Sequence, residues 1–471
     1  MLAIALLGVY AAALRVIWRS PFRALGILVA GMAVHSVLLM FLLRLTTPSV
    51  VVRLLQAWKE GILLLLLALA IRLGLRAWRD RRMPPLAPMD WVMAAFTVVI
   101  LVYFALPPSL FGSQVTTSQR LLGARVLLTL PLLYLLGRVF FSTRREDLVW
   151  NLRLIAGAAA FVAVAGLVEL FLIPTRAWLD GGVNLLSAWL GFTYHGPAGL
   201  PENFFQTIGQ GLYLRRMVST YVSPLPIAYT GLLVVPVAVG LILSARPVRR
   251  EQLVPVALLA LLVLGIVLSV TRLAIGLMIP EFLLLALLWW KRWILWATLV
   301  VVTLALAAVL VYPRVGPLVG PDLKSVPVHP HGLSLLSRGD SSFNEHSTTL
   351  SFDLQYVLQH PLGSGLGTSI HRFGQSQGTG ESAYFDVFGE AGVVAGLLYT
   401  GAYGMFLVFG LRAWRRHRGD PLPASIALVA LVGGLALIPI TLTSDVWSEL
   451  SVTYLLWWAA GYSVSLASSR W

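Results

Sequence analysis

Three arginines interrupt an otherwise apolar sequence at points where they could act on a phosphorylated substrate. Arg215 and Arg216 stand just before one hydrophobic segment, and Arg272 begins another directly after the turn 269–271. A guanidinium group binds phosphate oxygens in a bidentate manner. Charges near a bilayer are costly and usually pair or serve a function. We therefore expect the arginines to bind an anion such as a lipid diphosphate, the alternative being interfacial anchors that reach the head groups.

Three acids lie within ten residues at the start of a later hydrophobic segment, namely Glu381, Asp386 and Glu390. On a helix, Asp386 and Glu390 are four residues apart and share a face. Glu381 precedes that helix, where it could accept a proton as a general base. The alternative for these acids is stabilisation of a helix N-terminus. Ser382 and Tyr384, between them, are further candidate substrate-binding residues.

The segment 313–385 is the most polar part of the chain and contains five of its eight histidines, namely His329, His331, His346, His360 and His371. Because titratable residues are scarce elsewhere, we expect Arg338, His346 and His360 to contact substrate. The alternative is an ordinary solvated loop.

The residues give no indication of a metal or a cofactor. His329 and His331 have the spacing of metal ligands, but no third ligand follows at a recognisable distance in the sequence. Neither a phosphate-binding P-loop nor a dinucleotide-binding glycine motif occurs at a usable position. We therefore predict that the site contains neither a metal nor a cofactor.

The composition indicates the elements that must position these residues. The 471 residues include 58% hydrophobic and only 12% charged residues, with no cysteine and a mean hydropathy of +0.83. Soluble domains average about 45–50% apolar and about 25% charged residues, so a soluble enzyme is excluded. We predict an all-α, polytopic transmembrane protein with about 12–13 spans in a single domain, 1–471. The thirteen candidate spans lie near 1–17, 23–43, 57–77, 90–107, 121–141, 150–173, 224–244, 252–270, 272–290, 293–312, 386–411, 422–442 and 447–467.

The distribution of positive charge predicts the orientation of the chain. Six basic clusters fall on alternate loops, which the positive-inside rule assigns to the cytoplasm. Most of the net charge of +15 is therefore explained by topology, and nucleic acid is not an expected partner. The segments 174–222 and 313–385 then form two large loops on the outer side.

Each outer loop is expected to contain a short amphipathic helix. Leu350, Leu354 and Leu358 recur every four residues, which predicts a helix from about 347 to 359 that stops before His360-Pro361. In the first loop, an interfacial helix is predicted from five large apolar residues, Trp178, Leu185, Leu186, Trp189 and Leu190.

Taken together, four segments resemble the O-antigen ligase and O-antigen polymerase family of membrane glycosyltransferases. Residues 216–221 resemble its Arg-x-x-Gly-Thr-Phe segment, with Ser219 in place of the glycine. Residues 269–272 resemble its Thr-x-Ser-Arg turn, and 360–367 its His-Pro-Leu-Gly-x-Gly-x-Gly segment. Residues 381–396 resemble the run that ends in Glu-x-Gly. The resemblance covers about residues 210–410.

The resemblance implies a glycosyltransferase at the outer face of the bacterial inner membrane, with the active site facing the periplasm. Its donor would be a glycan on undecaprenyl diphosphate, held by Arg216 and Arg272, without metal or nucleotide. Glu381 stands where ligases have a histidine, and His346 lies where the family often has an arginine, so we expect a polymerase-like, inverting enzyme with Glu381 as the base. The alternatives are a ligase that transfers glycan to a lipid A-core or protein acceptor, and a lipid-linked glycan transporter. Membrane lipids are further expected partners.

Overall fold

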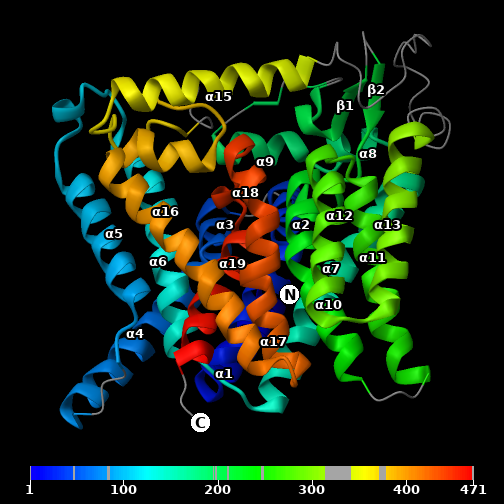
Figure 1. The fold of residues 1–471 in the computed structure, drawn as a ribbon. Helices are drawn as coiled ribbons and strands as arrows, with labels where there is room; N and C mark the ends of the chain where they lie inside the picture. Colours follow the sequence, from blue (N-terminus) through cyan, green and yellow to red (C-terminus); the bar gives the residue numbers. More distant parts are fainter. Residues whose placement is uncertain are drawn as a thin grey trace.

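The chain forms a bundle of helices that run between two opposite ends (Figure 1). The computed structural model describes residues 2–45, 48–81, 85–191, 193–194, 196, 199–208, 212–245, 249–312, 341–370 and 378–468. Each of the thirteen predicted hydrophobic segments coincides with a helix. The bundle helices are α1 (Leu2–Arg19), α2 (Ala24–Arg44), α4 (Trp58–Arg79), α5 (Pro88–Ala105), α6 (Thr117–Val139), α7 (Arg145–Leu172), α10 (Pro224–Ser244), α11 (Arg249–Leu268), α12 (Arg272–Trp289), α13 (Arg292–Leu310), α16 (Ala383–His417), α17 (Pro421–Leu428), α18 (Gly434–Thr443) and α19 (Leu450–Ser468). A π-helical turn, Val429–Gly433, joins α17 to α18.

Within the described residues, ten helical segments are long and apolar enough to cross a membrane. The chain is therefore an all-α, multi-pass membrane protein, as predicted. The other three predicted spans are the helices α1, α11 and α19. α11 begins with charged residues and has only a shorter apolar part, Gln252–Leu268. α19 contains several serine and threonine residues, which it tolerates because it is enclosed by protein along its length.

The core of the bundle is built around α10 and α19, whose side chains are almost all buried. Close packing of α19 against α6 depends on glycine. A Cβ atom on Gly461 would lie 2.0 Å from the carbonyl oxygen of Tyr134, and one on Gly137 would lie 2.1 Å from that of Trp458. Small residues allow membrane helices to approach this closely.

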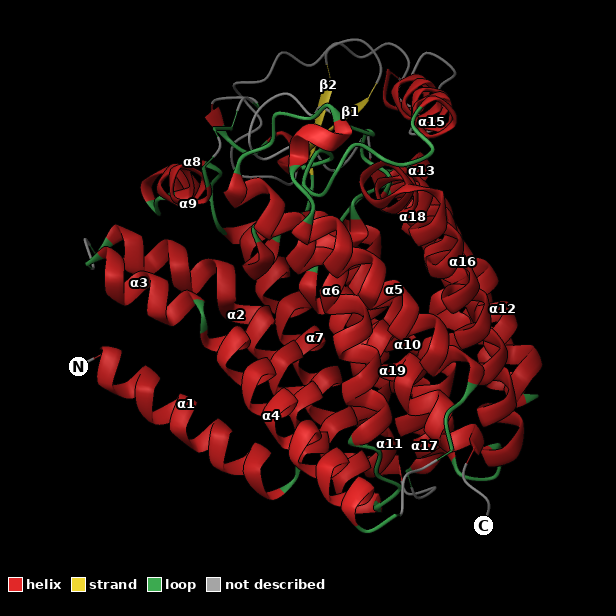
Figure 2. Cartoon of the chain, turned by 90° about the vertical axis from the view of Figure 1, so that its left-hand side faces the viewer, coloured by secondary structure: helices red, strands yellow, loops and turns green. Residues whose placement is uncertain are grey.

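The elements outside the bundle gather at one end (Figure 2). They are α8 (Arg176–Asp180), α9 (Val183–Leu190), the antiparallel strands β1 (Phe205–Ile208) and β2 (Leu212–Arg215), and α15 (Ser341–Gln359). A short helix, α3 (Ser49–Gln56), joins α2 to α4, and there are 3-10 turns at Pro21–Arg23 (η1), Pro108–Phe111 (η2), Glu202–Phe204 (η4), Ser219–Tyr221 (η5) and Val446–Ser448 (η9). α17 and the C-terminal end of α19 lie at the opposite end (Figure 1).

The predicted helix of the second loop is confirmed as α15, which begins six residues earlier than expected and ends before His360-Pro361. In the first loop, the predicted single helix is two helices, because the chain turns at Gly181-Gly182, where Gly182 has a φ of +93°. The β-hairpin was not predicted. Its sequence signal was the pair Gly209 and Gly211 between two short runs with strand-forming residues.

Candidate functional site

The motif segment 216–221 is hydrogen-bonded to the motif segment 269–272. Arg216, directly after β2, donates from Nε to the carbonyl oxygen of Ser269 at 2.8 Å and from Nη2 to Oγ1 of Thr271 at 2.9 Å. The backbone N–H of Met217 donates to Leu268 at the end of α11, at 3.0 Å. Arg216 therefore holds the turn between α11 and α12.

This turn is strained, which explains why it needs support. Val270 at its centre has a φ of +52°, a left-handed conformation that is rare for a β-branched residue. Its side chain is buried against Leu214 of β2, with Val309 and Tyr312 packed on the pair. The residue after the turn, Arg272, is the first residue of α12. The contacts of Arg216 thus fix the position from which Arg272 extends.

The positive charges of Arg216 and Arg272 are close enough to affect one another. Arg216 is only 7% exposed. Burial lowers the pKa of Arg216 to about 10; Tyr229 acts in the opposite direction, and the charge of Arg272 lowers the pKa further. Within the described residues, Arg216 forms no ion pair with an acid. Two adjacent cations in this arrangement can bind an anion with several oxygen atoms, such as a phosphate or diphosphate.

Arg215, although adjacent in sequence, points into the protein. Its Nη2 forms an ion pair with Glu169 of α7 at 2.7 Å, and the two side chains are 3% and 4% exposed. The other carboxylate oxygen of Glu169 accepts the backbone N–H of Val218 at 3.1 Å. Arg215 also donates to the carbonyl oxygen of Ile173 at 2.9 Å. The pair thus fastens the segment that carries Arg216 to α7, and the expected contact of Arg215 with substrate stays a prediction.

Ser219 adopts the conformation that the family's glycine would favour. Its φ is +49°, in the left-handed region. Its Oγ donates to the carbonyl oxygen of Val162 at 2.6 Å. This hydrogen bond to α7 compensates for part of the backbone strain and explains how a serine is accommodated here.

The motif segments 360–367 and 381–396 are also joined by hydrogen bonds. The glycine-rich segment 360–367 packs against α16 at the point where this helix is kinked. Three backbone N–H groups cross the contact, those of Val393, Ser364 and Gly365, which donate to Pro361, Gly389 and Glu390 at 2.9, 2.7 and 3.0 Å. The kink is at Gly392, which has φ +75° and ψ 176°. A Cβ atom on Gly363 would lie 2.6 Å from the nitrogen of Gly392, so a larger residue would separate the two segments.

Glu390 holds the same loop in place through its side chain. It is 4% exposed, and its Oε1 accepts the backbone N–H of Ser369 at 3.1 Å. The backbone of Gly367 donates a further hydrogen bond to this carboxylate. A Cβ atom on Gly123 of α6 would lie 3.0 Å from Oε2, so α6 closes the other side. This geometry gives Glu390 a role in positioning the loop, and its contact with substrate stays a prediction.

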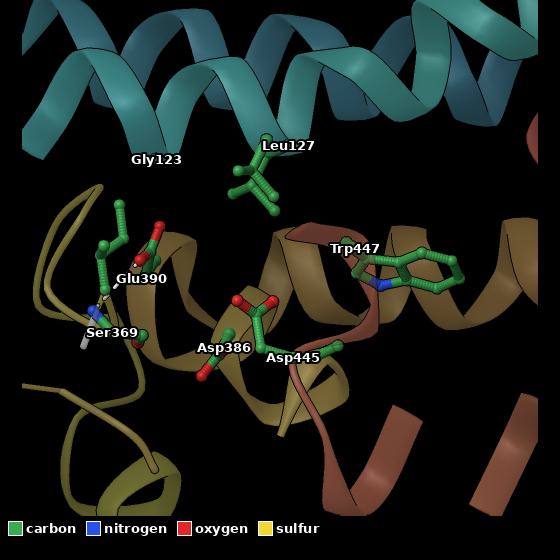
Figure 3. A pocket seen from close by; sticks show the side chains of 10 residues that line it. Gly123, Leu127, Ser369, Asp386, Glu390, Asp445 and Trp447 are labelled. Atoms are coloured by element: carbon green, nitrogen blue, oxygen red, sulfur yellow. Dashed lines mark hydrogen bonds between the residues drawn. The ribbon is translucent and has the colours of Figure 1, made fainter. Parts of the chain in front are cut away.

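A small cavity separates α6 from the start of α16 (Figure 3). Asp386, Glu390 and Asp445 contribute carboxylates to its wall, and its volume is about 30 Å³. That volume accommodates water but not a sugar ring. Oδ1 of Asp386 accepts the hydroxyl of Thr379 at 2.6 Å. Among the described residues, no group of three or more His, Cys, Asp or Glu side chains could hold a metal ion.

Ser382, and not Glu381, caps α16. Oγ of Ser382 accepts the N–H of Phe385 at 3.2 Å and donates to the carbonyl oxygen of Thr441 at 3.1 Å. Ser382 is only 1% exposed, so these contacts occupy it. Glu381 is exposed, and in the part of the chain that the structure describes its carboxylate makes no hydrogen bond or ion pair. Ser382 therefore supplies the side-chain hydrogen bond that caps α16, and both the proposed role of Glu381 as a base and its alternative as a charge near the helix N-terminus stay predictions.

Tyr229 of α10 lies near both Arg216 and acidic residues of the candidate site. Its hydroxyl hydrogen-bonds to Ser444, and it interacts electrostatically with Arg216 and more weakly with Glu449 and Glu381. The backbone N–H of Ala383 donates to the carbonyl oxygen of Ser444 at 3.1 Å, which ties the start of α16 to the same connection. Arg216 and Glu381 thus both lie within electrostatic range of Tyr229.

The other predicted site residues lie elsewhere or outside the described residues. The hydroxyl of Tyr384 is 3.1 Å from Oγ1 of Thr400, within an aromatic cluster on α16. His360 is exposed and stacks on Tyr356 at 4.3 Å between ring centroids, and His346 is exposed on α15. Arg338 lies outside the described residues, as do His329, His331 and His371.

Sequence reasoning missed Tyr229, Asp445 and Glu449. The two acids are the only charged residues between Asp420 and Arg470, one in the connection between the last two predicted segments and one at the start of the last segment. A search of short loops for charge would have found them. Tyr229 lies inside a hydrophobic segment, and no local pattern distinguishes it from a core tyrosine.

Comparison with known proteins adds no relative. No family model matches the sequence, and no curated protein matches it. The functional assignment therefore rests on the motif segments and on the geometry of the site.

Proposed function

We propose that this protein is a membrane glycosyltransferase that uses glycans linked to undecaprenyl diphosphate, and that it acts as a polymerase of the O-antigen type. The observation that carries the proposal is the buried guanidinium of Arg216, which lies beside Arg272 and pairs with no acid among the described residues. A cationic pair of this kind suits a diphosphate at the membrane surface. The elements of the two long loops support a site at the periplasmic face of the inner membrane, opposite the basic loops (Figure 2).

The reaction would be a single displacement. A hydroxyl of the acceptor sugar attacks the anomeric carbon of the donor, a carbon–oxygen bond forms, and the bond from that carbon to the phosphate oxygen breaks. Glu381 accepts the proton of the hydroxyl. Arg216 and Arg272 neutralise the charge that develops on the departing undecaprenyl diphosphate, so no metal ion is required. Attack from the face opposite the leaving group inverts the anomeric centre.

The geometry supports different roles for the two arginines. Arg216 has two donors engaged with the turn, so it both holds the turn and contributes positive charge. Arg272 extends from the first turn of α12 and is half-buried. We therefore assign the more direct contact with the diphosphate to Arg272, with Arg216 as its positioning residue and second cation.

The test is reconstitution of the purified protein in liposomes with a defined glycan repeat unit on undecaprenyl diphosphate. We expect a ladder of longer glycans to form without any lipid core acceptor. Arg272→Ala, Arg216→Ala and Glu381→Gln should each abolish the ladder. Arg176→Gln is the matched control, because Arg176 lies in α8 among the loop elements, is 85% exposed and, within the described part of the chain, pairs only with Asp180.

Each other outcome is informative. A single product that requires a lipid A-core or protein acceptor would identify a ligase in place of a polymerase. Movement of labelled donor across the bilayer without a new glycosidic bond, retained in Glu381→Gln, would identify a transporter. Ladders of equal length from the three site variants would refute the assignment of the site.

A further inference from the structure

A row of arginines on α4 lies outside the site described above. α4 is the least buried of the spanning helices, with 17% of its span buried, and it extends away from the bundle (Figure 1). Arg72, Arg76 and Arg79 are separated by four and three residues, so they lie on one face of the helix. At a rise of about 1.5 Å per residue, they cover about 10 Å along its axis.

These three arginines have no anionic partner within the protein. Among the described residues, none of them makes a hydrogen bond or an ion pair, and all three are exposed. Asp80, the nearest acid in sequence, is also exposed and forms no ion pair there. Arg72 follows directly on an apolar run of α4, where an unpaired charge would be costly. The protein therefore supplies the positive charge without neutralising it.

The surface between the arginines is apolar. Ala68, Ile71 and Leu75 line a hollow together with the three arginines. Leu75 is 60% exposed and the neighbouring Trp78 is 72% exposed. Tryptophan at such a position is typical of the boundary between acyl chains and head groups. An apolar floor bordered by guanidinium groups matches a phospholipid, whose acyl chains and phosphate lie side by side, better than it matches a soluble anion.

We propose that this face of α4 is a binding site for an anionic phospholipid of the leaflet at the basic end of the bundle. The phosphate is held by the arginines, and an acyl chain covers Ile71 and Leu75. The lipid thereby provides the anion that Arg72, Arg76 and Arg79 lack. A lipid with two phosphates is the best match, because one phosphate does not extend along the full row. This inference is independent of the proposed glycosyltransferase activity.

The experiment is a lipid titration of the purified full-length protein in detergent, read by native mass spectrometry and by the thermal unfolding midpoint. The probes are cardiolipin, phosphatidylglycerol, phosphatidylcholine and inorganic phosphate. The test variant is Arg72→Gln/Arg76→Gln/Arg79→Gln. The matched control is Arg412→Gln/Arg415→Gln/Arg418→Gln, which removes the same charge from the basic end of α16.

We expect cardiolipin, and to a smaller extent phosphatidylglycerol, to bind and to raise the unfolding midpoint. Each basic side chain near a membrane contributes about fivefold to such binding, so the α4 variant should bind about a hundredfold more weakly. The α16 control should bind like the unaltered protein. Equal binding by the α4 variant would overturn the proposal and leave the arginines as interfacial anchors. Equal binding of phosphatidylcholine, or displacement of the lipid by inorganic phosphate, would also overturn it.

Discussion

Arg216 holds, through two side-chain hydrogen bonds, the turn whose next residue is Arg272. The two cations of the site are therefore linked by structure as well as by charge. Any change at the turn should affect both, because Arg216 holds the residues on either side of the strained Val270.

The first prediction tests the contact between Arg216 and the turn while both arginine charges are kept. Thr271→Val keeps the β-branched shape but removes the oxygen that accepts from Nη2 of Arg216 at 2.9 Å and from Oγ of Ser269 at 3.0 Å. The lost hydrogen bond to the charged guanidinium alone is worth about 1.5–3 kcal/mol, so donor affinity should fall about tenfold or more. The measurement is binding of undecaprenyl diphosphate by the purified variant. Thr303→Val is the control, because Thr303 is exposed on α13 and bonds only within its helix. Unchanged affinity in Thr271→Val would contradict the link.

The second prediction concerns pH. Burial lowers the pKa of Arg216 to about 10, below the ordinary value for arginine. A base with a lowered pKa loses its charge at a lower pH, so its contribution to anion binding is complete below pH 10 and disappears as pH rises through 10. The difference in diphosphate affinity between the unaltered protein and Arg216→Ala should therefore be large at pH 8 and much smaller at pH 11, where only the contacts of Arg216 with the turn contribute. Circular dichroism checks that the fold persists. A difference that stays constant to pH 11 would show that Arg216 remains charged or does not contact the anion.

The third prediction tests the structural role of Arg215. Removal of one member of a buried ion pair leaves an uncompensated charge and costs about 3–5 kcal/mol. Arg215→Met and Glu169→Leu should each lower the unfolding midpoint strongly, whereas the double variant should recover part of the loss. The exposed pair Arg176 and Asp180, 3.9 Å apart, supplies the control, whose removal should have little effect. Additive losses in the Arg215/Glu169 double variant would mean that the two residues act independently.

The fold could be predicted because apolar length and the alternation of basic loops are local properties of the sequence. The motif residues were found because charge is rare in this chain. Their roles were not separable by sequence. Arg215 and Arg216 are neighbours, but among the described residues only Arg215 pairs with an acid. Glu390 is buried and accepts backbone hydrogen bonds, whereas Glu381 is exposed. Tyr229 could not be predicted, because its role depends on the packing of α10 against a connection more than two hundred residues later.

The fourth prediction distinguishes the two glutamates. Glu381 is exposed and makes no hydrogen bond or ion pair in the described residues, so Glu381→Gln should leave the unfolding midpoint unchanged. As a general base it contributes about 100-fold or more to turnover, which the variant should lose while it still binds donor. Glu390→Gln should show the reverse, a lower midpoint and a smaller loss of turnover, because the carboxylate accepts backbone N–H groups of the glycine-rich loop. Asp180→Asn controls for removal of an acid near the loops. Full turnover in Glu381→Gln would exclude it as the base.

The fifth prediction concerns Ser219, which stands where the resembled family has glycine. Its φ of +49° costs an L-residue about 1–2 kcal/mol, and the hydrogen bond from Oγ to Val162 returns about 1 kcal/mol. Ser219→Gly removes both terms and should change stability by less than about 1 kcal/mol. Ser219→Ala keeps the strain but loses the hydrogen bond, and Ser219→Val adds a β-branched side chain. The unfolding midpoint should therefore fall in the order glycine, alanine, valine.

The control is Ser351→Gly, in the exposed helical stretch of α15, which should lower stability by about 1 kcal/mol. A loss in Ser219→Gly as large as that in Ser219→Ala would mean that the hydrogen bond to α7, and not the backbone conformation, determines which residues are tolerated at this position.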